Sequence, residues 1–239
     1  MGKAGLSLAL VVAAAGYGNR LSSGLPKQYV PLLGIPMLQR TLSALSSCPE
    51  VNAMVVVVNY EDVEYCSNEI ALEYIDKVVR VAAGGEERVI SVRNGLQALA
   101  EVGKWDLVGV HDGARPLVTC TEIGRAVDTL AEDPSLDGVV LAIPSTDTVK
   151  IVDDEGIIQS TPTRKYLWRA QTPQIFRWSV LWEAYNQPEE ALLGATDDAS
   201  LVEARDGRVK VVLGSPENFK ITDRVDLRHA EHILAERRR

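Results

Sequence analysis

The sequence predicts an α/β fold built on a mostly parallel, doubly wound sheet, with a β-arm protruding from it. Short runs rich in Val and Leu, with few polar residues inside them, are typical of strands buried on both faces. Amphipathic stretches alternate with these runs. Such alternation implies right-handed crossovers and helices on both faces of a parallel sheet. A third observation, an irregular segment at about 145–175, predicts the arm.

Five runs are expected to form buried strands, and two amphipathic stretches are expected to form helices. The strand candidates are 8–13, 54–58, 78–81, 107–110 and 139–143. In the first helix candidate, 88–102, Val89, Val92, Leu96 and Leu99 recur every three or four residues and share one face. The second candidate is 222–237, with Thr222 as its expected N-cap. A chain of 239 residues is the length of one domain, which we expect to span 1–239.

The segment 145–175 is expected to form the arm, inserted into this domain. Two β-prone runs flank Asp153-Asp154-Glu155-Gly156, a pattern that predicts a hairpin turn. An arm outside the core exposes its apolar side chains unless another surface covers them; these are Ile157, Ile158, Tyr166, Leu167 and Trp168. We expect a second subunit to cover them, so that the protein forms a homodimer through the arm. The alternative is an arm that folds back on its own domain.

Charge and cysteine content exclude several classes of function. The net charge of −8 is opposite to that of a nucleic-acid binder, so no nucleic-acid partner is expected. The apolar stretch 6–15 is too short to span a membrane and is interpreted as a buried strand, so no membrane partner is expected. Cys48, Cys66 and Cys120 are odd in number and widely spaced. They predict neither a disulfide framework nor a zinc site, and they favour a reducing, cytoplasmic location.

The loop after the first strand has the composition of a phosphate-binding loop. Glycines at 16 and 18 let the backbone approach a phosphate chain, and Arg20 and Lys27 add two cations. The loop is not a Walker A motif, because the ordered pattern of that motif is missing. It is not a dinucleotide fingerprint either, because Leu21 stands where the third glycine belongs. A plain turn with two solvated charges is the alternative.

Two further loops follow predicted strands, where ligands of open α/β sheets bind. The loop 84–88 leads into a helix that carries Ser91 in its first turn, an arrangement that suits an anion or a base edge but also an ordinary cap. In the loop 111–116, Asp112 is a candidate ligand of Mg²⁺, directly or through water, or an acceptor for a sugar hydroxyl. Arg115 could pair with a phosphate or brace the loop. His111 is expected to be structural.

Later loops supply hydroxyl groups and one more cation. The hydroxyls of Thr148, Thr172 and Thr196 could face a polyol, or each could simply form a turn. Lys220 precedes the final helix, where its ammonium group could reach across a cleft.

These segments form an ordered set. Its members are the first loop, Pro26-Lys27-Gln28, Gly84-Gly85-x-x-Arg88-x-x-Ser91-Val92, His111-Asp112-x-Ala114-Arg115-Pro116, Asp147-Thr148, Gln171-Thr172-Pro173-Gln174, Thr196-Asp197-x-Ala199-Ser200 and Asn218-x-Lys220. The set resembles the 2-C-methyl-D-erythritol 4-phosphate cytidylyltransferases of the non-mevalonate isoprenoid pathway, over residues 7 to 235. The sequence departs from the family at Gly113, where Ala is common, and at Leu21, where Met is frequent.

The resemblance implies a nucleotidyltransferase-type fold, a homodimer joined by the arm, and transfer of CMP from CTP to methylerythritol phosphate with Mg²⁺. Arg20 and Lys27 match residues that stabilise the transition state. Lys220 and Arg164 match those that position the sugar-alcohol phosphate, with Arg164 coming from the partner's arm. The matching substrate and CTP positions are Ala14, Ala15, Gly16, Gly18, Gly84, Gly85, Glu86, Ser91, Asp112, Ala114, Arg115, Thr148, Thr172 and Thr196.

Three other functions remain open from the sequence. A ribitol-5-phosphate cytidylyltransferase would share Arg20, Lys27, Asp112 and Lys220, although the runs 91–96 and 164–172 resemble the methylerythritol branch more. A non-catalytic nucleotide-binding regulator should have lost a cation, yet all are present. A sugar-nucleotide synthase that uses UTP or GTP is possible on the same fold. It stays open because the choice of base rests on backbone contacts, which a sequence does not show.

Overall fold

The computed structural model describes residues 5–16, 25–74 and 76–237. Its main element is a seven-stranded sheet in the order β11-β7-β10-β6-β1-β4-β5. The strands are β1 (Leu8–Ala13), β4 (Val51–Val58), β5 (Val78–Ala83), β6 (Leu107–Asp112), β7 (Gly138–Pro144), β10 (Trp168–Arg177) and β11 (Val209–Leu213). All neighbouring pairs are parallel except those of β10, which runs antiparallel to both β6 and β7. The α/β prediction and its five strands are confirmed.

Helices cover both faces of this sheet, as the alternating pattern predicts. The helices are α1 (Met37–Ser46), α2 (Val63–Tyr65), α3 (Arg88–Val102), α4 (Cys120–Glu132), α5 (Trp178–Tyr185), α6 (Glu189–Leu192), α7 (Asp198–Glu203) and α8 (Arg224–Glu236). One core lies between the sheet and the apolar faces of α1 and α4. The other lies between the opposite sheet face and α3, α5 and α7. The α3 prediction matches to the residue.

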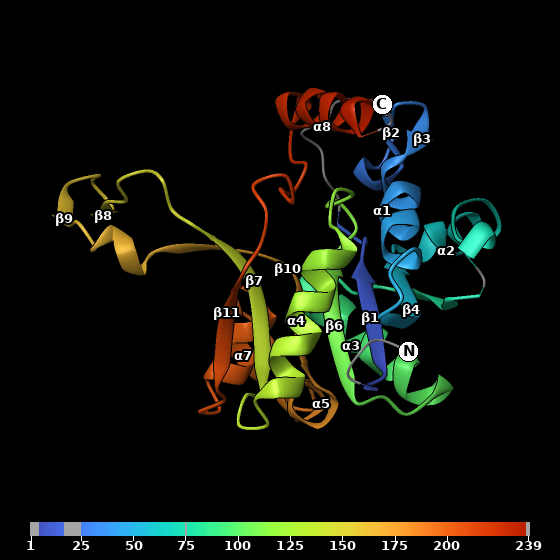
Figure 1. Ribbon diagram of the computed structural model, residues 1–239, viewed down its shortest axis with the longest axis horizontal. Helices are drawn as coiled ribbons and strands as arrows, with labels where there is room; N and C mark the ends of the chain where they lie inside the picture. Colours follow the sequence, from blue (N-terminus) through green and yellow to red (C-terminus); the bar gives the residue numbers. More distant parts are fainter. Residues whose placement is uncertain (1–4, 17–24, 75, 238–239) are drawn as a thin grey trace.

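A third apolar cluster lies at one end of the sheet, under α8. Ala230 and Ile233 of α8 pack on Leu32, Met37 and Leu117. Leu32 belongs to a small hairpin, β2 (Pro31–Leu32) and β3 (Ile35–Pro36). Figure 1 shows α8 beyond the ends of the strands, beside this hairpin. The C-terminal helix is therefore anchored near the loops that follow the strands.

Short helical turns connect these elements. They are the 3₁₀ turns η2 (Lys27–Tyr29), η3 (Tyr60–Asp62), η5 (Leu72–Tyr74) and η6 (Arg164–Tyr166), and the π-helical turn η4 (Cys66–Ile70).

The arm is present, but it is shorter than predicted. Its tip is the hairpin β8 (Ile151–Val152) and β9 (Ile158–Ser160), which projects away from the sheet (Figure 1). The turn between them has Gly156 at a φ of 82°, as a tight turn requires. Residues 168–177 are not part of a free arm, because they form β10 of the central sheet. The sequence argument missed this because Gln171, Thr172 and Gln174 are polar, although all three are buried.

Four smaller expectations are corrected. The strand β5 is an edge strand and exposes Val79, so it is not buried on both faces. The N-cap of α8 is Asp223, not Thr222: the Asp223 carboxylate accepts from two backbone N–H groups, while Thr222 donates to Asp226. The edge strand β11 was not predicted, because its exposed residues interrupt the apolar run.

The fourth correction concerns the cysteines. Cys48 and Cys120 form a disulfide, with Cα atoms 4.9 Å apart, across a sequence separation of 72. Cys48 follows α1 and Cys120 begins α4. The two helices share one sheet face, and this proximity in space cannot be inferred from the spacing along the chain. Cys66 is a free, buried cysteine.

Candidate functional site

The carboxyl ends of β1, β5 and β6 meet at one edge of the sheet and border a cavity. The register pairs Ala13 of β1 with Asp112 of β6, so the loops after these strands start side by side. The cavity measures about 240 Å³. Its lining is Ala13, Ala14, Ala15, Gly16, Lys27, Gln28, Gly85, Glu86, Glu87, Arg88, Ser91, Asp112, Gly113, Ala114 and Lys220. The loops singled out in the sequence thus converge on one hollow.

A second cavity, of about 390 Å³, adjoins the first. It is bounded by Arg88, Asp112, Arg115, Ala170, Gln171, Thr172, Gln174, Thr196, Asp197 and Lys220. Its polar wall comes from β10, whose antiparallel course places residues 170–174 beside the carboxyl ends of β6 and β7. Arg88, Asp112 and Lys220 line both cavities. They stand at the boundary, where groups bound in the two cavities would approach each other.

Asp112 is the centre of charge at this boundary. Its Oδ2 lies 3.2 Å from the Lys220 ammonium and 3.3 Å from Arg115 Nε. Its Oδ1 lies 3.6 Å from Arg88 Nε. Burial alone would raise the pKa of Asp112, but the positive charges of Lys220, Arg88 and Arg115 outweigh burial and hold the pKa below its usual range. Asp112 is therefore an anion at neutral pH.

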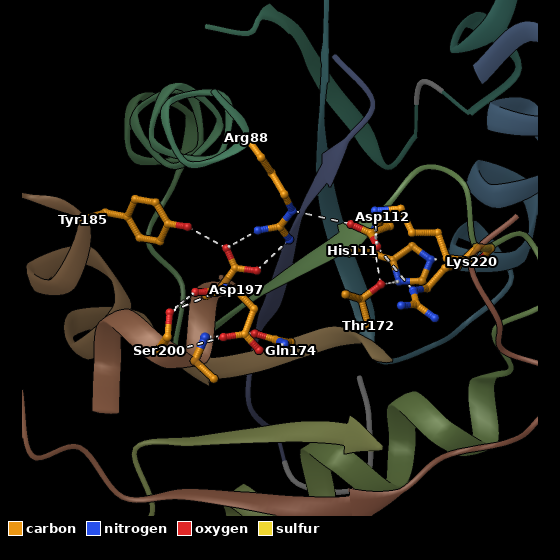
Figure 2. Close-up of polar contacts among 12 residues, drawn as sticks. Arg88, His111, Asp112, Thr172, Gln174, Tyr185, Asp197, Ser200 and Lys220 are labelled. Atoms are coloured by element: carbon orange, nitrogen blue, oxygen red, sulfur yellow. Dashed lines mark hydrogen bonds and ion pairs between the residues drawn. The ribbon is translucent and has the colours of Figure 1, made fainter. Parts of the chain in front are cut away.

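His111 is a buried neighbour of Asp112 in this arrangement. It is fully buried, with one ring nitrogen 3.1 Å from the Arg115 carbonyl oxygen and the other 3.1 Å from the Thr172 hydroxyl. Burial lowers its pKa to about 4, so the ring is neutral at physiological pH. The Thr172 hydroxyl also accepts a hydrogen bond from the Asp112 backbone N–H. Figure 2 shows His111, Asp112 and Thr172 together. This agrees with the structural role expected for His111.

Lys220 is held by the loop that precedes α8. Asn218 is fully buried and donates from Nδ2 to the Thr172 carbonyl oxygen at 2.9 Å. The Asn218 carbonyl oxygen accepts from Arg115 at 2.8 Å, and the Ile221 N–H donates to the Ala114 carbonyl oxygen. The loop is thus fastened to β10 and to the loop after β6, which fixes the stem of Lys220 beside Asp112.

The start of α3 forms the opposite wall of the first cavity. The Ser91 hydroxyl accepts from the Gly85 N–H at 3.1 Å and folds the loop against the helix. A Cβ at Gly84 would lie 2.5 Å from Ala15 Cβ and 2.6 Å from Ser91 Oγ, so only glycine permits this approach. The side chain of the N-cap residue, Glu87, makes no capping hydrogen bond to the first N–H groups of α3. These donors face an anion or a base edge favourably.

Arg88, in the first turn of α3, connects the boundary to a buried carboxylate. Its guanidinium makes two hydrogen bonds to Asp198, which is fully buried at the start of α7. Figure 2 shows Arg88 between Tyr185 on one side and Asp112 on the other.

Comparison with known proteins identifies the family. The model of the family described as 2-C-methyl-D-erythritol 4-phosphate cytidylyltransferase matches residues 8–236. The chain belongs to this family. It is 41% identical to the 2-C-methyl-D-erythritol 4-phosphate cytidylyltransferase of Geobacter metallireducens, over 95% of this chain and 97% of that one. It is also 41% identical to the enzyme of that name from Alkaliphilus metalliredigens, over 96% and 93% of the two chains.

Solved structures of family members have the same fold. The crystal structure of 4-diphosphocytidyl-2C-methyl-D-erythritol synthase from Anaerococcus prevotii has a TM-score of 0.83 and 31% identity, and covers 97% of each chain. The 2-C-methyl-D-erythritol 4-phosphate cytidylyltransferase of Francisella tularensis has a TM-score of 0.79 and 31% identity, over 95% of this chain and 99% of that one. The nucleotidyltransferase-type fold expected from the sequence is thereby confirmed.

Most of the residues selected by their match to the family lie at the two cavities. Those at the first are Ala14, Ala15, Gly16, Lys27, Gly85, Glu86, Ser91, Asp112, Ala114 and Lys220, with Gly84 packed directly behind. Those at the second are Asp112, Arg115, Thr172, Thr196 and Lys220. Arg164 and Thr148 lie in the arm, outside both cavities, and Arg164 donates to the Thr146 carbonyl oxygen. Gly18 and Arg20 lie outside the described residues.

Several residues at the site were not assigned a role from the sequence. Gln28 lines the first cavity and donates from Nε2 to Asp62 at 3.3 Å. Gln174 and Asp197 line the second and are hydrogen-bonded to each other at 2.8 Å. These three stand in or beside the family motifs, so the motif match is a signal that could have selected them. Tyr185 lies in no motif, and nothing in the sequence connects it to the site.

Proposed function

We propose that this protein transfers CMP from CTP to 2-C-methyl-D-erythritol 4-phosphate, giving 4-diphosphocytidyl-2-C-methyl-D-erythritol and pyrophosphate. Membership of the family supports the reaction, since its relatives are named for it. The observation that carries the proposal is the pair of adjoining cavities. They share Asp112, Arg88 and Lys220, so two anionic substrates can meet at a boundary that carries positive charge.

We assign the first cavity to CTP. Backbone around Ala14, Ala15 and Gly16 approaches the triphosphate. The same role is proposed for Gly18 from its match to the family. The loop of Gly84, Gly85 and Glu86, with Ser91 behind it, presents backbone groups to the cytosine and ribose. Ala114 also lines this cavity, as Asp112 does.

We assign the second cavity to the sugar-alcohol phosphate. Thr196 lines this cavity, and Arg115 supplies a cation. The Thr172 hydroxyl is engaged with Asp112 and His111, so Thr172 shapes the wall. We further propose that Arg164 and Thr148 of the partner subunit's arm complete this cavity, because both lie on the exposed arm.

The reaction follows from the placement of charge. The phosphate of the sugar alcohol attacks the α-phosphorus of CTP in line and needs no general base, because it is already an anion. Its bond to phosphorus forms as the bond to pyrophosphate breaks. Lys27, in η2, lines the CTP cavity, and with Arg20 it balances the charge that develops on the non-bridging and leaving oxygens. Lys220 holds the attacking phosphate beside Asp112.

Magnesium is the cofactor that we propose. No cluster of three or more metal-binding side chains occurs in the part of the chain that the structure describes. A single carboxylate is nevertheless enough when substrate phosphates and water complete the octahedron, which is the usual mode for Mg²⁺ at nucleotides. Asp112, buried, anionic and facing the CTP cavity, fits that mode. When bound, Mg²⁺ neutralises phosphate charge.

We also propose a homodimer joined through the arm. Six large apolar side chains of the arm are exposed, among them Ile157, Ile158 and Tyr166, and a partner would cover them. No helix among the described residues is long and apolar enough to cross a bilayer. We place the protein in the cytoplasm, where CTP is available, and expect no nucleic-acid partner.

The test is pyrophosphate release by the purified protein with Mg²⁺ and CTP. Methylerythritol 4-phosphate and ribitol 5-phosphate are supplied in parallel, and UTP replaces CTP as a control. Release with CTP and methylerythritol phosphate alone is the expected result. Release only with ribitol phosphate would show that the protein acts on a different substrate. No release with either sugar-alcohol phosphate would overturn the proposal.

A further inference from the structure

We infer that Asp198 is a positioning residue for this reaction: through Arg88 it holds the Asp112 carboxylate in place between the two cavities. The inference rests on the proposed function and deepens it. Neither Asp198 nor Tyr185 lines the shared boundary. Their effect on the boundary must therefore pass through Arg88, which lies within ion-pair distance of the carboxylates of Asp198 and Asp112.

The Asp198–Arg88 pair has the geometry of a fixed support. Arg88 Nη1 donates to Asp198 Oδ1 at 3.1 Å, and Nη2 donates to Oδ2 at 2.8 Å. Such a two-point contact fixes both the position and the plane of a guanidinium. The third nitrogen of the guanidinium, Nε, lies 3.6 Å from Asp112 Oδ1. Arg88 is thus bonded firmly on one side and only approaches Asp112 on the other (Figure 2).

Asp198 is itself held from three directions. It is fully buried, and the hydroxyl of the buried Tyr185 donates to its Oδ1 at 2.5 Å. Burial, with the Asp198 charge, raises the pKa of Tyr185, so the phenol keeps the proton that it donates. The neighbouring Asp197 caps α7, and Gln174 of β10 binds both the Asp197 carboxylate and the Ala199 N–H. The residues on either side of Asp198 are therefore bonded to the same strand that forms the second cavity.

A charge argument gives the consequence. Arg88, Arg115 and Lys220 surround Asp112, while Asp198 binds Arg88 alone among these three. Arg88 lies within ion-pair distance of the carboxylates of Asp198 and Asp112. When the charge of Asp198 is removed, Asp112 remains to attract the guanidinium. The Arg88 guanidinium should then move to Asp112 and form a direct hydrogen bond. That would draw Oδ1 toward Arg88 and displace the carboxylate from its position at the boundary of the two cavities.

The decisive variant is Asp198→Asn, which keeps the size of the side chain and removes its charge. We expect kcat to fall about 10-fold to 100-fold, as a displacement of about 1 Å at a reacting centre can cost. The KM for CTP should stay within about twofold of the wild-type value, because the base and ribose are bound elsewhere. The affinity for CTP, measured by calorimetry without turnover, should likewise be unchanged.

Two further variants separate positioning from folding. Glu189→Gln removes another ion pair of α3, that of Glu189 with Arg93 at 2.7 Å, and neither partner lines the two cavities. Because Glu189 is half exposed, this variant should leave both kcat and the melting temperature nearly unchanged. Arg88→Lys keeps the positive charge but cannot make the two-point contact of a guanidinium with Asp198, so it should lower kcat as Asp198→Asn does. It carries the test if Asp198→Asn does not fold. A folded variant with wild-type kcat, in either case, overturns the inference.

A crystal structure of Asp198→Asn gives a readout that needs no activity. We expect Arg88 hydrogen-bonded to Asp112, at about 2.7–2.9 Å. Arg88 left in its present position would contradict the inference even if the wild-type protein released no pyrophosphate. Conversely, a wild-type protein that is inactive with every sugar-alcohol phosphate would refute the proposed function alone.

Discussion

The side-chain amide of Asn218 donates to the main-chain carbonyl oxygen of Thr172 at 2.9 Å and joins the loop before α8 to β10. This bond fastens Lys220, two residues later, beside Asp112. We expect Asn218→Ala to lower kcat, because Lys220 loses its fixed position, and to cost about 1–3 kcal/mol of stability, because a buried carbonyl group is left unpaired. Steady-state kinetics and thermal unfolding measure the two effects.

Ser215→Ala is the matched control for this variant. Ser215 lies in the same loop, and its partly exposed side-chain hydroxyl accepts from the Glu217 N–H at 3.1 Å. Its removal should leave kcat as it is. Equal losses in the two variants would mean that the loop merely contributes to folding.

Lys27→Ala should abolish most turnover with the fold intact. Lys27 lines the CTP cavity, and the loss of one cation that stabilises developing charge costs on the order of 10²–10³ in kcat. Pyrophosphate release measures the loss, and circular dichroism checks the fold. Lys104→Ala, at an exposed lysine after α3, is the control and should retain full activity. Unchanged activity in Lys27→Ala would refute the mechanism.

Ile158→Glu should weaken the proposed dimer. Ile158 is 57% exposed in β9, and a charge placed there would be buried against a partner subunit. Light scattering after size-exclusion chromatography should show a dimer for the wild type and monomers for the variant. Activity should fall in parallel, because the partner's Arg164 would be withdrawn from the second cavity.

Val225→Glu provides the comparison for Ile158→Glu. Val225 is 63% exposed on α8, away from the arm. Its substitution should therefore change neither the molar mass measured by light scattering nor the activity. A wild-type protein that is monomeric at micromolar concentration would refute the dimer itself.

The Cys48–Cys120 disulfide should make stability depend on reductant. It closes a loop across a sequence separation of 72, which in the chain-entropy relation corresponds to about 4 kcal/mol. Unfolding in urea should therefore shift to lower concentration when dithiothreitol is added. The Cys48→Ser variant should unfold at the same concentration with and without reductant. Identical curves for the wild type under both conditions would show that the thiols stay reduced in solution.

The sequence predicted those parts of the molecule that local patterns encode. Buried strands show as apolar runs, and α3 shows as a periodic face, so both were found with nearly correct bounds. Asp112 was found because strand ends converge at one sheet edge, whereas Lys220 was selected by its match to the family. The path of β10 was not predictable in the same way. Its polar residues are buried only because the antiparallel strand lies between β6 and β7, a fact of topology.

Contacts between distant segments account for the rest. Tyr185 and Asp198 meet because α5 and α7 pack on the same sheet face, and Cys48 meets Cys120 because α1 and α4 share the other. No spacing along the chain encodes either meeting. Arg164 illustrates a further limit, since its proposed place in the site depends on a second chain.

His111 should make stability fall as the pH is lowered. Its folded-state pKa of about 4 lies below the ordinary value of 6.5, so between these values only the unfolded chain takes up the proton. The contribution is therefore fully present above about pH 6.5 and is lost as the pH falls through 4. Its full size is on the order of 3 kcal/mol. Asp112 adds a loss of the same sign only at lower pH, below about 4.

Urea unfolding at several pH values between 4 and 7 measures this dependence, with His111→Asn for comparison. The variant has no imidazole to protonate, so its stability should change less across the window, whatever its absolute value. The difference between the two slopes isolates His111 from the carboxylates that both proteins share. Parallel slopes would mean that His111 titrates normally in the folded protein, which is incompatible with a ring buried between Thr172 and the Arg115 carbonyl group.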